Sequence, residues 1–374
     1  MDLDFSEEQE ALRGMVRELC RDHATIEVVR AMEDDPHGVP KELWKQLGEV
    51  GLLGLRVGEE HGGSAQGLLE AALVYEEFGR TLAPIPHLES CVVSAAILER
   101  AGTAAQRAQW LPRIASGDAI LTPAWLEPDR GYGPVGIALE ARAADGGFRL
   151  TGTKRHVTFA DAADRLLVVA RTGDGEAGID LFLVDPHGPG VRLTQQLSLG
   201  SNTQYRVDFD DCVVAEADRI GGVGVGWAAL TEALYDAAVL NGAWANGACE
   251  QALEITTQYA KDRVQFGKPL GAFQSIAHYL ADARTQLDGS RPLIFQAGWA
   301  RDEGRPLNEL APMAKLFACQ NFRETTAVCE QVFGGVGFTV EYDIQLFFRR
   351  AKQLQISWWD DRHLEELIAR ETLD

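Results

Sequence analysis

Two segments in the C-terminal half of the chain carry residue types that suit the binding of a pyrophosphate. The first, YAKDRVQFGKPLGAFQ, spans positions 259–274. Its pattern predicts a helix that ends near Arg263, because Gly267 favours a turn and Pro269 cannot continue a helix. A guanidinium at a helix end offers paired donors to two non-bridging phosphate oxygens. An ordinary surface arginine is the alternative interpretation of this residue taken alone.

The second segment, QVFGGVGF, spans positions 331–338 and combines a side-chain amide with three glycines. Gly334, Gly335 and Gly337 permit positive φ angles and a close approach of the backbone to a ligand, and Gln331 offers its amide one turn earlier. A helix C-cap followed by a loop explains the same residues. The segment therefore indicates either a ligand contact or a helix end.

Other chemical motifs are weak. The glycine run at 221–226 lies outside any βαβ unit, so we interpret it as an interdomain joint and not as a dinucleotide fingerprint. The sequence contains no P-loop and no GxSxG elbow. The histidines lack the HxxxH or HxH spacing of metal ligands, so no metal site is predicted. The six cysteines form no CxxC pair and are expected to be reduced and packed.

The hydrophobic periodicity divides the chain into three regions. It is helical from Phe5 to about Gly117, with a possible capping box at Ser6 and Gln9, then β-type from about Asp118, and helical again after Gly226. We therefore expect a helical domain at 1–118, a β domain at 119–222 and a helical bundle at 223–374.

Within these regions the pattern predicts individual elements. The expected helices are Lys41–Val50, Leu68–Arg80, Ser90–Arg100, Ala104–Ser116, Trp227–Arg263, Phe273–Asp302 and Glu309–Phe333. The expected strands are Ile137–Ala143, Phe148–Thr151, Leu166–Ala170, Leu181–Val184 and Tyr205–Phe209. Their close spacing predicts antiparallel pairing in a small sandwich or barrel, with a hairpin turn at Asp145-Gly146-Gly147.

Charge and hydropathy exclude several classes of function. The 374 residues include 35 Lys+Arg and 56 Asp+Glu, which gives a net charge of −21 and argues against nucleic-acid and membrane-surface binding. No run of about 18 uncharged apolar residues occurs, so a membrane span is not predicted. The N-terminal sequence MDLDFSEEQE is acidic, unlike a secretory leader, and a cytoplasmic protein is expected.

Four segments in order resemble the acyl-CoA dehydrogenase family over nearly the whole chain. They are LDFSEEQEALR at 3–13, GTKRHVTFADAADRLLVVAR at 152–171, and the segments at 259–274 and 331–338. The resemblance implies an α+β multidomain fold: an N-terminal helical domain, a central antiparallel β-barrel or sandwich domain and a C-terminal four-helix bundle. It also implies an FAD-dependent oxidoreductase of lipid or steroid catabolism.

The implied reaction removes two hydrogens across Cα–Cβ of an acyl-CoA thioester. A carboxylate base takes the α-proton, the β-hydrogen leaves as hydride to the flavin, and an electron-transfer flavoprotein accepts the electrons. One flavin site is built from two chains, so a homo- or hetero-oligomer is implied. The cofactor-binding residues implied by the resemblance are Thr158, Arg263, Phe266, Gln274, Gln331, Gly334 and Gly335.

These residues fall into two groups. Arg263, Phe266 and Gln274 would contact the FAD of the neighbouring subunit, and 331–335 would contact its ADP end. Thr158 would lie along the flavin ring. His156 stands where the family commonly has a tryptophan, and either stacking on the flavin or a partly exposed strand position fits it.

The chain departs from the family where the chemistry takes place. Leu126 stands in place of the threonine of a TEPxAGS-like run. The family glutamate that follows RxAK aligns with Trp358, and the alternative family glutamate aligns with about Ala237. The nearest carboxylates are Asp236 and Asp360, and Asp360 also suits the N-cap of a closing helix. No catalytic base is assigned.

Three hypotheses follow. The chain could be an acyl-CoA dehydrogenase with a relocated base. It also resembles the shorter, glutamate-less subunit of heteromeric acyl-CoA dehydrogenases of actinobacterial steroid catabolism, which would brace FAD beside a glutamate-bearing homologue. A paralogue without a redox role is the third hypothesis. The acyl group is not readable from the sequence.

Overall fold

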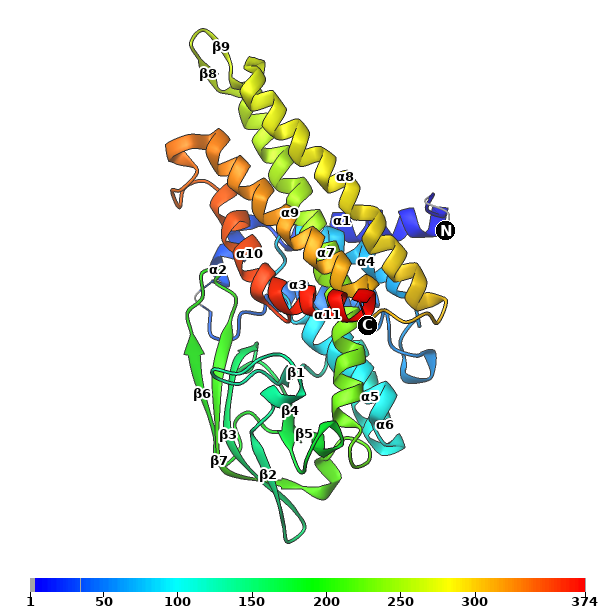
Figure 1. The fold of residues 1–374 in the computed structure, drawn as a ribbon. Helices are drawn as coiled ribbons and strands as arrows, with labels where there is room; N and C mark the ends of the chain where they lie inside the picture. The colour runs from blue at the N-terminus through cyan, green and yellow to red at the C-terminus, as the bar shows by residue number, and fades with distance from the viewer. Residues whose placement is uncertain (1–3, 34, 374) are drawn as a thin grey trace.

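The computed structural model describes residues 4–33 and 35–373, which form a helical region, a curled β-sheet and a long helical bundle (Figure 1). The first helix begins at the expected capping box: Ser6 Oγ accepts from the Gln9 amide, and Gln9 Oε1 accepts from the Ser6 amide. The N-terminal α-helices are α1 (Glu7–His23), α2 (Ile26–Ala31), α3 (Lys41–Glu49), α4 (Leu68–Arg80), α5 (Ala95–Ala101) and α6 (Ala104–Ser116).

The helix expected at Ser90–Arg100 differs from the prediction. A π-helical segment, Leu88–Ser94, precedes α5 and starts two residues earlier. The Ser90 hydroxyl accepts from the Leu121 amide and the Ser94 hydroxyl donates to the Leu121 carbonyl, so this segment is fastened to the first β-strand. Single-turn π-helices occur mostly at functional sites, and this one lines a cavity described below.

The β region is one sheet whose strand order is β1-β4-β2-β3-β7-β6, with β5 paired to β4. The turn at 145–147 joins β2 to β3 as expected, with Gly146 at φ 79°. The strands are β1 (Leu121–Ala124), β2 (Glu140–Ala144), β3 (Gly147–Thr158), β4 (Arg165–Arg171), β5 (Ile179–Val184), β6 (Val191–Gln196) and β7 (Gln204–Ala215).

Three details of the predicted sheet were wrong. Strand β1 pairs with β4 in parallel, because 40 residues of chain separate them and allow the crossover that a hairpin cannot make. Strands β1 and β6 were missed, since β1 contains Pro123 and β6 carries only two apolar residues, Val191 and Leu193. The run predicted from Ile137 enters the sheet only at Glu140, after a 3₁₀ turn at 134–136.

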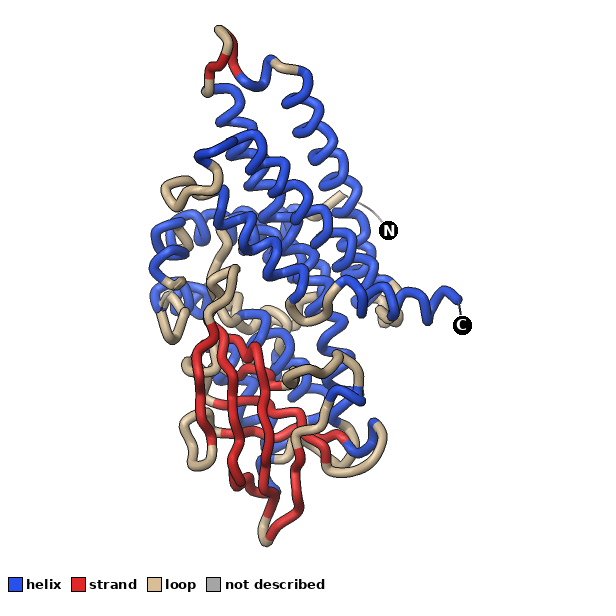
Figure 2. Tube along the Cα trace, turned by 60° about the vertical axis from the view of Figure 1, so that its left-hand side comes forward, coloured by secondary structure: helices blue, strands red, loops and turns tan. Residues whose placement is uncertain are grey.

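The C-terminal region is a bundle in which α7 packs against α4, α8 and α9. A two-stranded hairpin, β8–β9, lies at the far tip of α7 and α8, at the opposite end of the molecule from the sheet (Figures 1 and 2). The helices are α7 (Gly226–Asp262), α8 (Gln274–Asp302), α9 (Leu310–Phe333), α10 (Ile344–Ile356) and α11 (Asp361–Leu373), and the hairpin strands are β8 (Val264–Gln265) and β9 (Lys268–Pro269).

The cysteines and two glycines mark tightly packed parts of the structure. All six cysteines are free and buried, as expected from their apolar neighbours. Helix α7 contacts α4 closely at Gly79 and Gly247, where an added Cβ would lie 2.0 Å from the Trp244 carbonyl oxygen and 1.8 Å from that of Glu76, respectively. Among the described residues, none of the helices is both long and apolar enough to cross a membrane.

Candidate functional site

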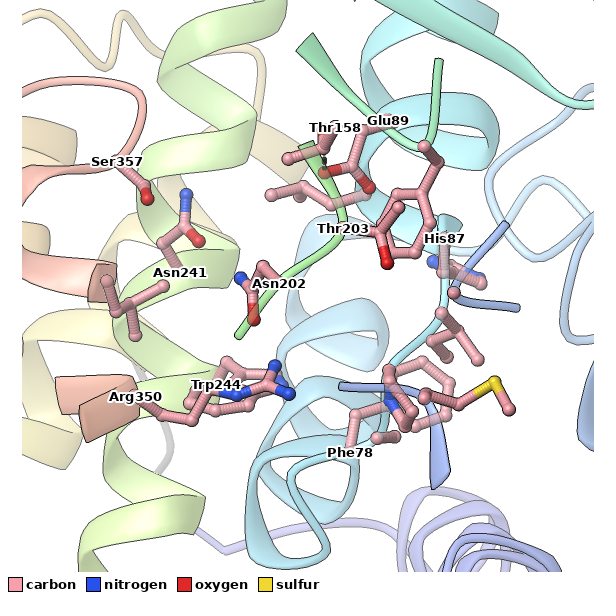
Figure 3. A pocket seen from close by; sticks show the side chains of 18 of the residues that line it. Phe78, His87, Glu89, Thr158, Asn202, Thr203, Asn241, Trp244, Arg350 and Ser357 are labelled. Carbon is pink, nitrogen blue, oxygen red and sulfur yellow. Dashed lines mark hydrogen bonds between the residues drawn. The ribbon is translucent and has the colours of Figure 1, made fainter. Parts of the chain in front are cut away.

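A small, deep cavity lies where the N-terminal helices, the sheet and the bundle meet (Figure 3). Its volume is about 100 Å³, and we call it the inner cavity. Helix α4, the π-helical segment, the end of β3, the 201–203 loop, α7 and the end of α10 supply its walls. The labelled side chains in Figure 3 are Phe78, His87, Glu89, Thr158, Asn202, Thr203, Asn241, Trp244, Arg350 and Ser357.

Glu89 and Thr158 join the π-helical segment to the end of strand β3. The Thr158 hydroxyl donates to Glu89 Oε1 over 2.8 Å. Burial raises the pKa of Glu89 from 4.5 to about 7, and the hydrogen bond from Thr158 offsets only part of that effect. Thr158, expected along the flavin ring, is thus bonded to a carboxyl group that sequence reasoning missed.

A buried histidine stands beside this pair. His87 Nδ1 lies 2.8 Å from the Tyr75 hydroxyl and His87 Nε2 lies 3.1 Å from the Leu52 carbonyl oxygen. Because that carbonyl can only accept, Nε2 carries the ring proton and Nδ1 accepts from the tyrosine. Burial lowers the pKa of His87 to about 4, so the ring is neutral and acts as a fixed wall.

The position of the usual family glutamate is occupied by Trp358, which lines the inner cavity with a positive φ of 67°. Lys315 Nζ donates to the carbonyls of Leu354 and Trp359, at 3.3 and 2.8 Å, and so holds the turn that contains this tryptophan. An indole cannot accept a proton from carbon, so the position has no base.

Asp236, one of the two candidate carboxylates, lies in a structural ion cluster. It is fully buried, and its oxygens lie 2.6 Å from Arg301 Nε and 3.3 Å from both Arg56 Nη2 and Arg100 Nη2. Three guanidiniums surround this carboxylate, and it does not line the inner cavity. The geometry therefore gives it a role in joining α7 to the N-terminal helices.

Asp360, the second candidate, caps the closing helix as its sequence position indicated. Its Oδ1 accepts from the His363 amide over 2.9 Å, immediately before α11. It also borders a second, larger cavity of about 1160 Å³ on the sheet side of the molecule, which we call the outer cavity. Thr158, Ser357 and Trp358 line both cavities, so a ligand in the outer cavity can extend into the inner one.

The outer cavity offers the surface expected for a flavin. Arg155 and His156 line it from β3, and Trp125 and Tyr132 line it from the 125–132 loop. Arg155 Nε is buried there without a hydrogen-bond partner among the described residues. His156 is exposed and has a φ of 53°, and its Nδ1 lies 3.1 Å from Gln204 Oε1. These contacts fit either a ring that stacks on the flavin or a partly exposed strand residue.

The loop that replaces the family TEPxAGS-like run is anchored by a buried ion pair. Lys154 Nζ lies 2.7 Å from Glu127 Oε1 and 3.2 Å from the Trp125 carbonyl. The same Glu127 oxygen accepts from the amides of Ala138 and Leu139. Leu126 therefore lies on a rigid loop, although it offers no hydroxyl at the place where the family has a threonine.

Arg263, Phe266 and Gln274 lie at the bundle tip, far from the two cavities of their own chain (Figures 1 and 2). All three are exposed, and Phe266 exposes 92% of its surface on the β8–β9 hairpin. Val264 on the same hairpin is also exposed, so two apolar side chains face solvent at the end of the helical arm. Within one chain, Arg263, Phe266 and Gln274 are therefore too far from Thr158 to contact the same ligand.

Gln331, Gly334 and Gly335 end α9 near the base of that tip. Tyr259 and Phe333 stack with centroids 4.1 Å apart, which ties the end of α9 to the last turns of α7. Gly334 has φ 67°, a conformation that only glycine adopts readily. Glu330 is 2% exposed, and both of its carboxylate oxygens lack a partner among the described residues.

The residues present fit the expected FAD only when two chains are considered together. The outer cavity has the volume and the unpartnered Arg155 donor for a flavin and its chain of phosphates. The exposed guanidinium of Arg263 and the open backbone at 334–335 lie on another part of the surface. Within the residues described, no cluster of His, Cys, Asp and Glu could hold a metal ion.

Sequence reasoning missed the inner cavity because its polar residues come from four separate elements: the π-helical segment with the residue before it, the 201–203 loop, α7 and α10. His87, Glu89, Asn202, Asn241 and Arg350 share no motif and no spacing. The one available signal was the group of polar residues His87, Glu89 and Ser90 between apolar segments.

Comparison with known proteins places the whole chain in one family. Models of the acyl-CoA dehydrogenase N-terminal, middle and C-terminal domains match residues 6–118, 123–212 and 224–372. Acyl-CoA dehydrogenase FadE27 of Mycobacterium tuberculosis is 31% identical over 366 residues, which cover 96% of this chain and 95% of that protein.

Solved structures agree. A chain of the ChsE4–ChsE5 complex from Mycobacterium tuberculosis is 29% identical with a TM-score of 0.89, covering 99% of this chain and 98% of that one. The FAD complex of PigA is 25% identical with a TM-score of 0.90, covering 99% of both chains. The fold, the paired cavities and these matches show that the chain belongs to the acyl-CoA dehydrogenase family, FAD-dependent oxidoreductases that act on CH–CH bonds.

Proposed function

We propose that this chain is a subunit of a heteromeric acyl-CoA dehydrogenase and braces the FAD of a glutamate-bearing partner. The observation that carries the proposal is the absence of a base where the family needs one. Trp358 occupies one family position, Ala237 lies at the other, and neighbouring Asp236 is held by three arginines. Proton abstraction then falls to the partner chain.

The exposed bundle tip supports the bracing role. Arg263, Phe266 and Gln274 at the tip, with Gln331, Gly334 and Gly335 at the end of α9, lie far from this chain's own cavities. Residues that bind FAD from such a position must reach a cofactor seated in another chain. A heteromeric relative, the ChsE4–ChsE5 complex, has this fold over its whole length.

The chemistry of the assembly follows from the family reaction. Bound FAD supplies the hydride acceptor for the β-hydrogen, while the partner's carboxylate takes the α-proton. Arg263 would neutralise pyrophosphate charge, and the 334–335 backbone would let the ADP end approach closely. The proposal includes an electron-transfer flavoprotein as the acceptor of electrons and a cytoplasmic location.

A self-sufficient dehydrogenase is the second candidate function, and Glu89 favours it. Among the described residues that line the inner cavity, Glu89 is the one carboxyl group, and it is bonded to Thr158. A carboxyl with a pKa of about 7 has the proton affinity that a general base needs near neutral pH. In this case the chain would carry out the whole reaction as a homomer.

Flavin content distinguishes the two functions. The chain is purified alone and then after co-expression with a glutamate-bearing homologue, and FAD per subunit is measured from the visible flavin absorption band. The heteromer predicts little flavin in the chain alone and about one flavin per pair of chains in the complex. Stoichiometric flavin in the chain alone that bleaches on addition of an acyl-CoA, and no longer bleaches in Glu89→Gln, would establish the homomer.

A further inference from the structure

The inner cavity contains a buried cation without a counter-ion. Arg350, near the middle of α10, is 6% exposed, and its Nε is buried without a hydrogen-bond partner. Over the described residues, its guanidinium makes neither a hydrogen bond nor an ion pair. Burial lowers the pKa of Arg350 to about 10, which still leaves the group charged at neutral pH. A buried unpaired charge is costly, so it indicates an anion that the cavity receives.

The carboxylates nearest to Arg350 are engaged elsewhere. Glu33 attracts Arg350 electrostatically, but its Oε1 lies 2.6 Å from Nη2 of the neighbouring Arg349. Arg349 also donates to the Ser201 hydroxyl, which fixes it on the outer side of the loop. Glu89 lies on the opposite wall of the inner cavity, where it accepts from Thr158 (Figure 3).

Two side-chain amides on the same wall of the cavity as Arg350 also lack hydrogen-bond partners. Asn241 Nδ2, on α7, is a buried donor without an acceptor, and Asn202 Oδ1 is a buried acceptor without a donor. Figure 3 shows both side chains on the same side of the cavity as Arg350. A carboxylate placed there would accept from the guanidinium and from Asn241 together, which satisfies two of these three groups.

The size and the entrance of the cavity define the rest of the ligand. Thr158, Ser357 and Trp358 are shared with the outer cavity, so an acyl group enters past them with its thioester on the outer side. Phe78 and Trp244 supply apolar contact for methylene groups. A volume of about 100 Å³ holds a chain of a few carbons and excludes a polycyclic acyl group.

We propose that the inner cavity binds a short acyl group with a carboxylate at its far end, and that Arg350 is the residue that recognises this carboxylate. The inference rests on the proposed function in one respect, since it takes the inner cavity as an acyl site. It concerns binding, so it holds whichever chain abstracts the proton.

The first experiment compares CoA esters that differ in one group. Binding of succinyl-CoA and butyryl-CoA, and of glutaryl-CoA and valeryl-CoA, is measured by anaerobic calorimetry on the flavin-loaded assembly. We expect the ester with the terminal carboxylate to bind at least tenfold more tightly in one pair, as a charge-assisted hydrogen bond would give. Arg350→Gln should abolish this preference. Lys352→Gln, which removes a positive charge from the same helix outside the cavity, should retain it.

The second experiment separates a ligand-binding arginine from a structural one. Thermal unfolding of the wild type, Arg350→Gln and Arg350→Lys is followed with succinate, glutarate, butyrate or chloride added. Without ligand, Arg350→Gln should raise the melting temperature, because it removes an uncompensated charge. The dicarboxylates should raise the melting temperature of the wild type and raise that of Arg350→Lys by less. They should leave the melting temperature of Arg350→Gln unchanged.

The outcomes distinguish the two proposals. If neither CoA ester binds but the dicarboxylates stabilise the protein through Arg350, the anion subsite stands and the acyl-CoA function falls. Equal binding of both esters in each pair overturns the subsite and leaves the function. A lower melting temperature for Arg350→Gln, or equal stabilisation by chloride, would show a structural arginine or a site for any small anion, and either result rejects the proposal.

Discussion

At the scale of single residues, the polar groups of this protein differ in whether they have partners. Asp236 is fully buried among three arginines, whereas Arg350 and Glu330 are buried with unpartnered polar atoms. Three arginines compensate the buried charge of Asp236, whereas an unpaired buried group calls for an explanation such as a ligand, an ion or water. Glu89 differs from the carboxylates of the ion clusters in its partner. It accepts a hydrogen bond from the neutral Thr158 hydroxyl and faces a cavity, whereas those carboxylates contact arginines.

Replacement of Glu89 by glutamine should change how stability depends on pH. The pKa of Glu89 is raised from 4.5 to about 7 in the folded chain, so the folded state binds the proton more tightly than the unfolded state does. Its contribution to stability is therefore present at low pH and is lost as pH rises to about 7. The free energy of unfolding of Glu89→Gln minus that of the wild type should increase by roughly 3 kcal/mol from pH 4.5 to 8.

Urea denaturation at several pH values measures this difference. Glu49→Gln, at an exposed pair with Lys45, serves as the control and should show no such trend. A difference between Glu89→Gln and the wild type that stays constant with pH would mean that Glu89 is ionised in the folded chain.

The buried ion pair of Lys154 and Glu127 should affect the free energy of unfolding far more than an exposed pair in the same sheet does. Lys154→Met leaves a buried carboxylate without its cation, and we expect a loss of about 3–5 kcal/mol in the free energy of unfolding. Arg142→Met removes the exposed pair with Glu140 and should cost less than about 1 kcal/mol. Urea denaturation compares them, and equal losses would refute the argument from burial.

At the scale of elements, the α4–α7 contact fixes the walls of the inner cavity. The two helices approach so closely that glycine is required at Gly79 and at Gly247. Phe78 and Asn241 lie within one or two turns of these glycines and face the cavity from the two helices. The helix contact therefore sets the width of the inner cavity, because cavity and contact share one pair of backbones.

A methyl group at this contact should be strongly destabilising. Gly247→Ala would place a Cβ 1.8 Å from the Glu76 carbonyl oxygen, and separating the helices should cost about 3 kcal/mol or more. Gly289→Ala is the matched control on α8, since no atom lies within 4 Å of its new Cβ. It should stabilise the protein by about 0.5–1 kcal/mol through helix propensity. Thermal unfolding measures both, and similar effects would contradict the close contact.

At the scale of the whole molecule, the residues that the family resemblance assigns to FAD lie in two groups at opposite ends of the folded chain. The outer cavity lies at the sheet, and Arg263 and Phe266 lie at the bundle tip (Figures 1 and 2). The long helices α7 and α8 separate the two groups, so one chain cannot place both of them on one cofactor. Under the proposed function, a second chain completes the flavin site.

A charge placed on the bundle tip should weaken that association without unfolding the chain. Phe266 is 92% exposed, so Phe266→Glu should leave the melting temperature of the isolated chain unchanged. In the co-expressed complex it should lower both the FAD content and the fraction of assembled chains, measured by sedimentation velocity. Val213→Glu, at an exposed apolar position on the sheet, is the control. Full assembly of Phe266→Glu would exclude the tip from the interface.

The sequence by itself determined the family, the order of the regions and most helix bounds. Local periodicity predicts Leu68–Arg80, and the capping box of Thr103 and Gln106 also marks the start of Ala104–Ser116. The loss of the family glutamate was also readable, since it concerns one position in one motif. The implied FAD contacts stay predictions, but their location on exposed segments accords with them.

Only the tertiary structure decided which polar residues share a cavity. The pairing of Glu89 with Thr158 and the engagement of Asp236 depend on contacts between residues 65 to 180 positions apart. The isolation of Arg350 depends on the absence of such contacts. The parallel pairing of β1 with β4 is likewise a long-range choice. The sequence specifies the type of each side chain, but its burial and its hydrogen-bond or ion-pair partners depend on how the whole chain packs. Burial and partners in turn determine the charge of a side chain and what it can bind.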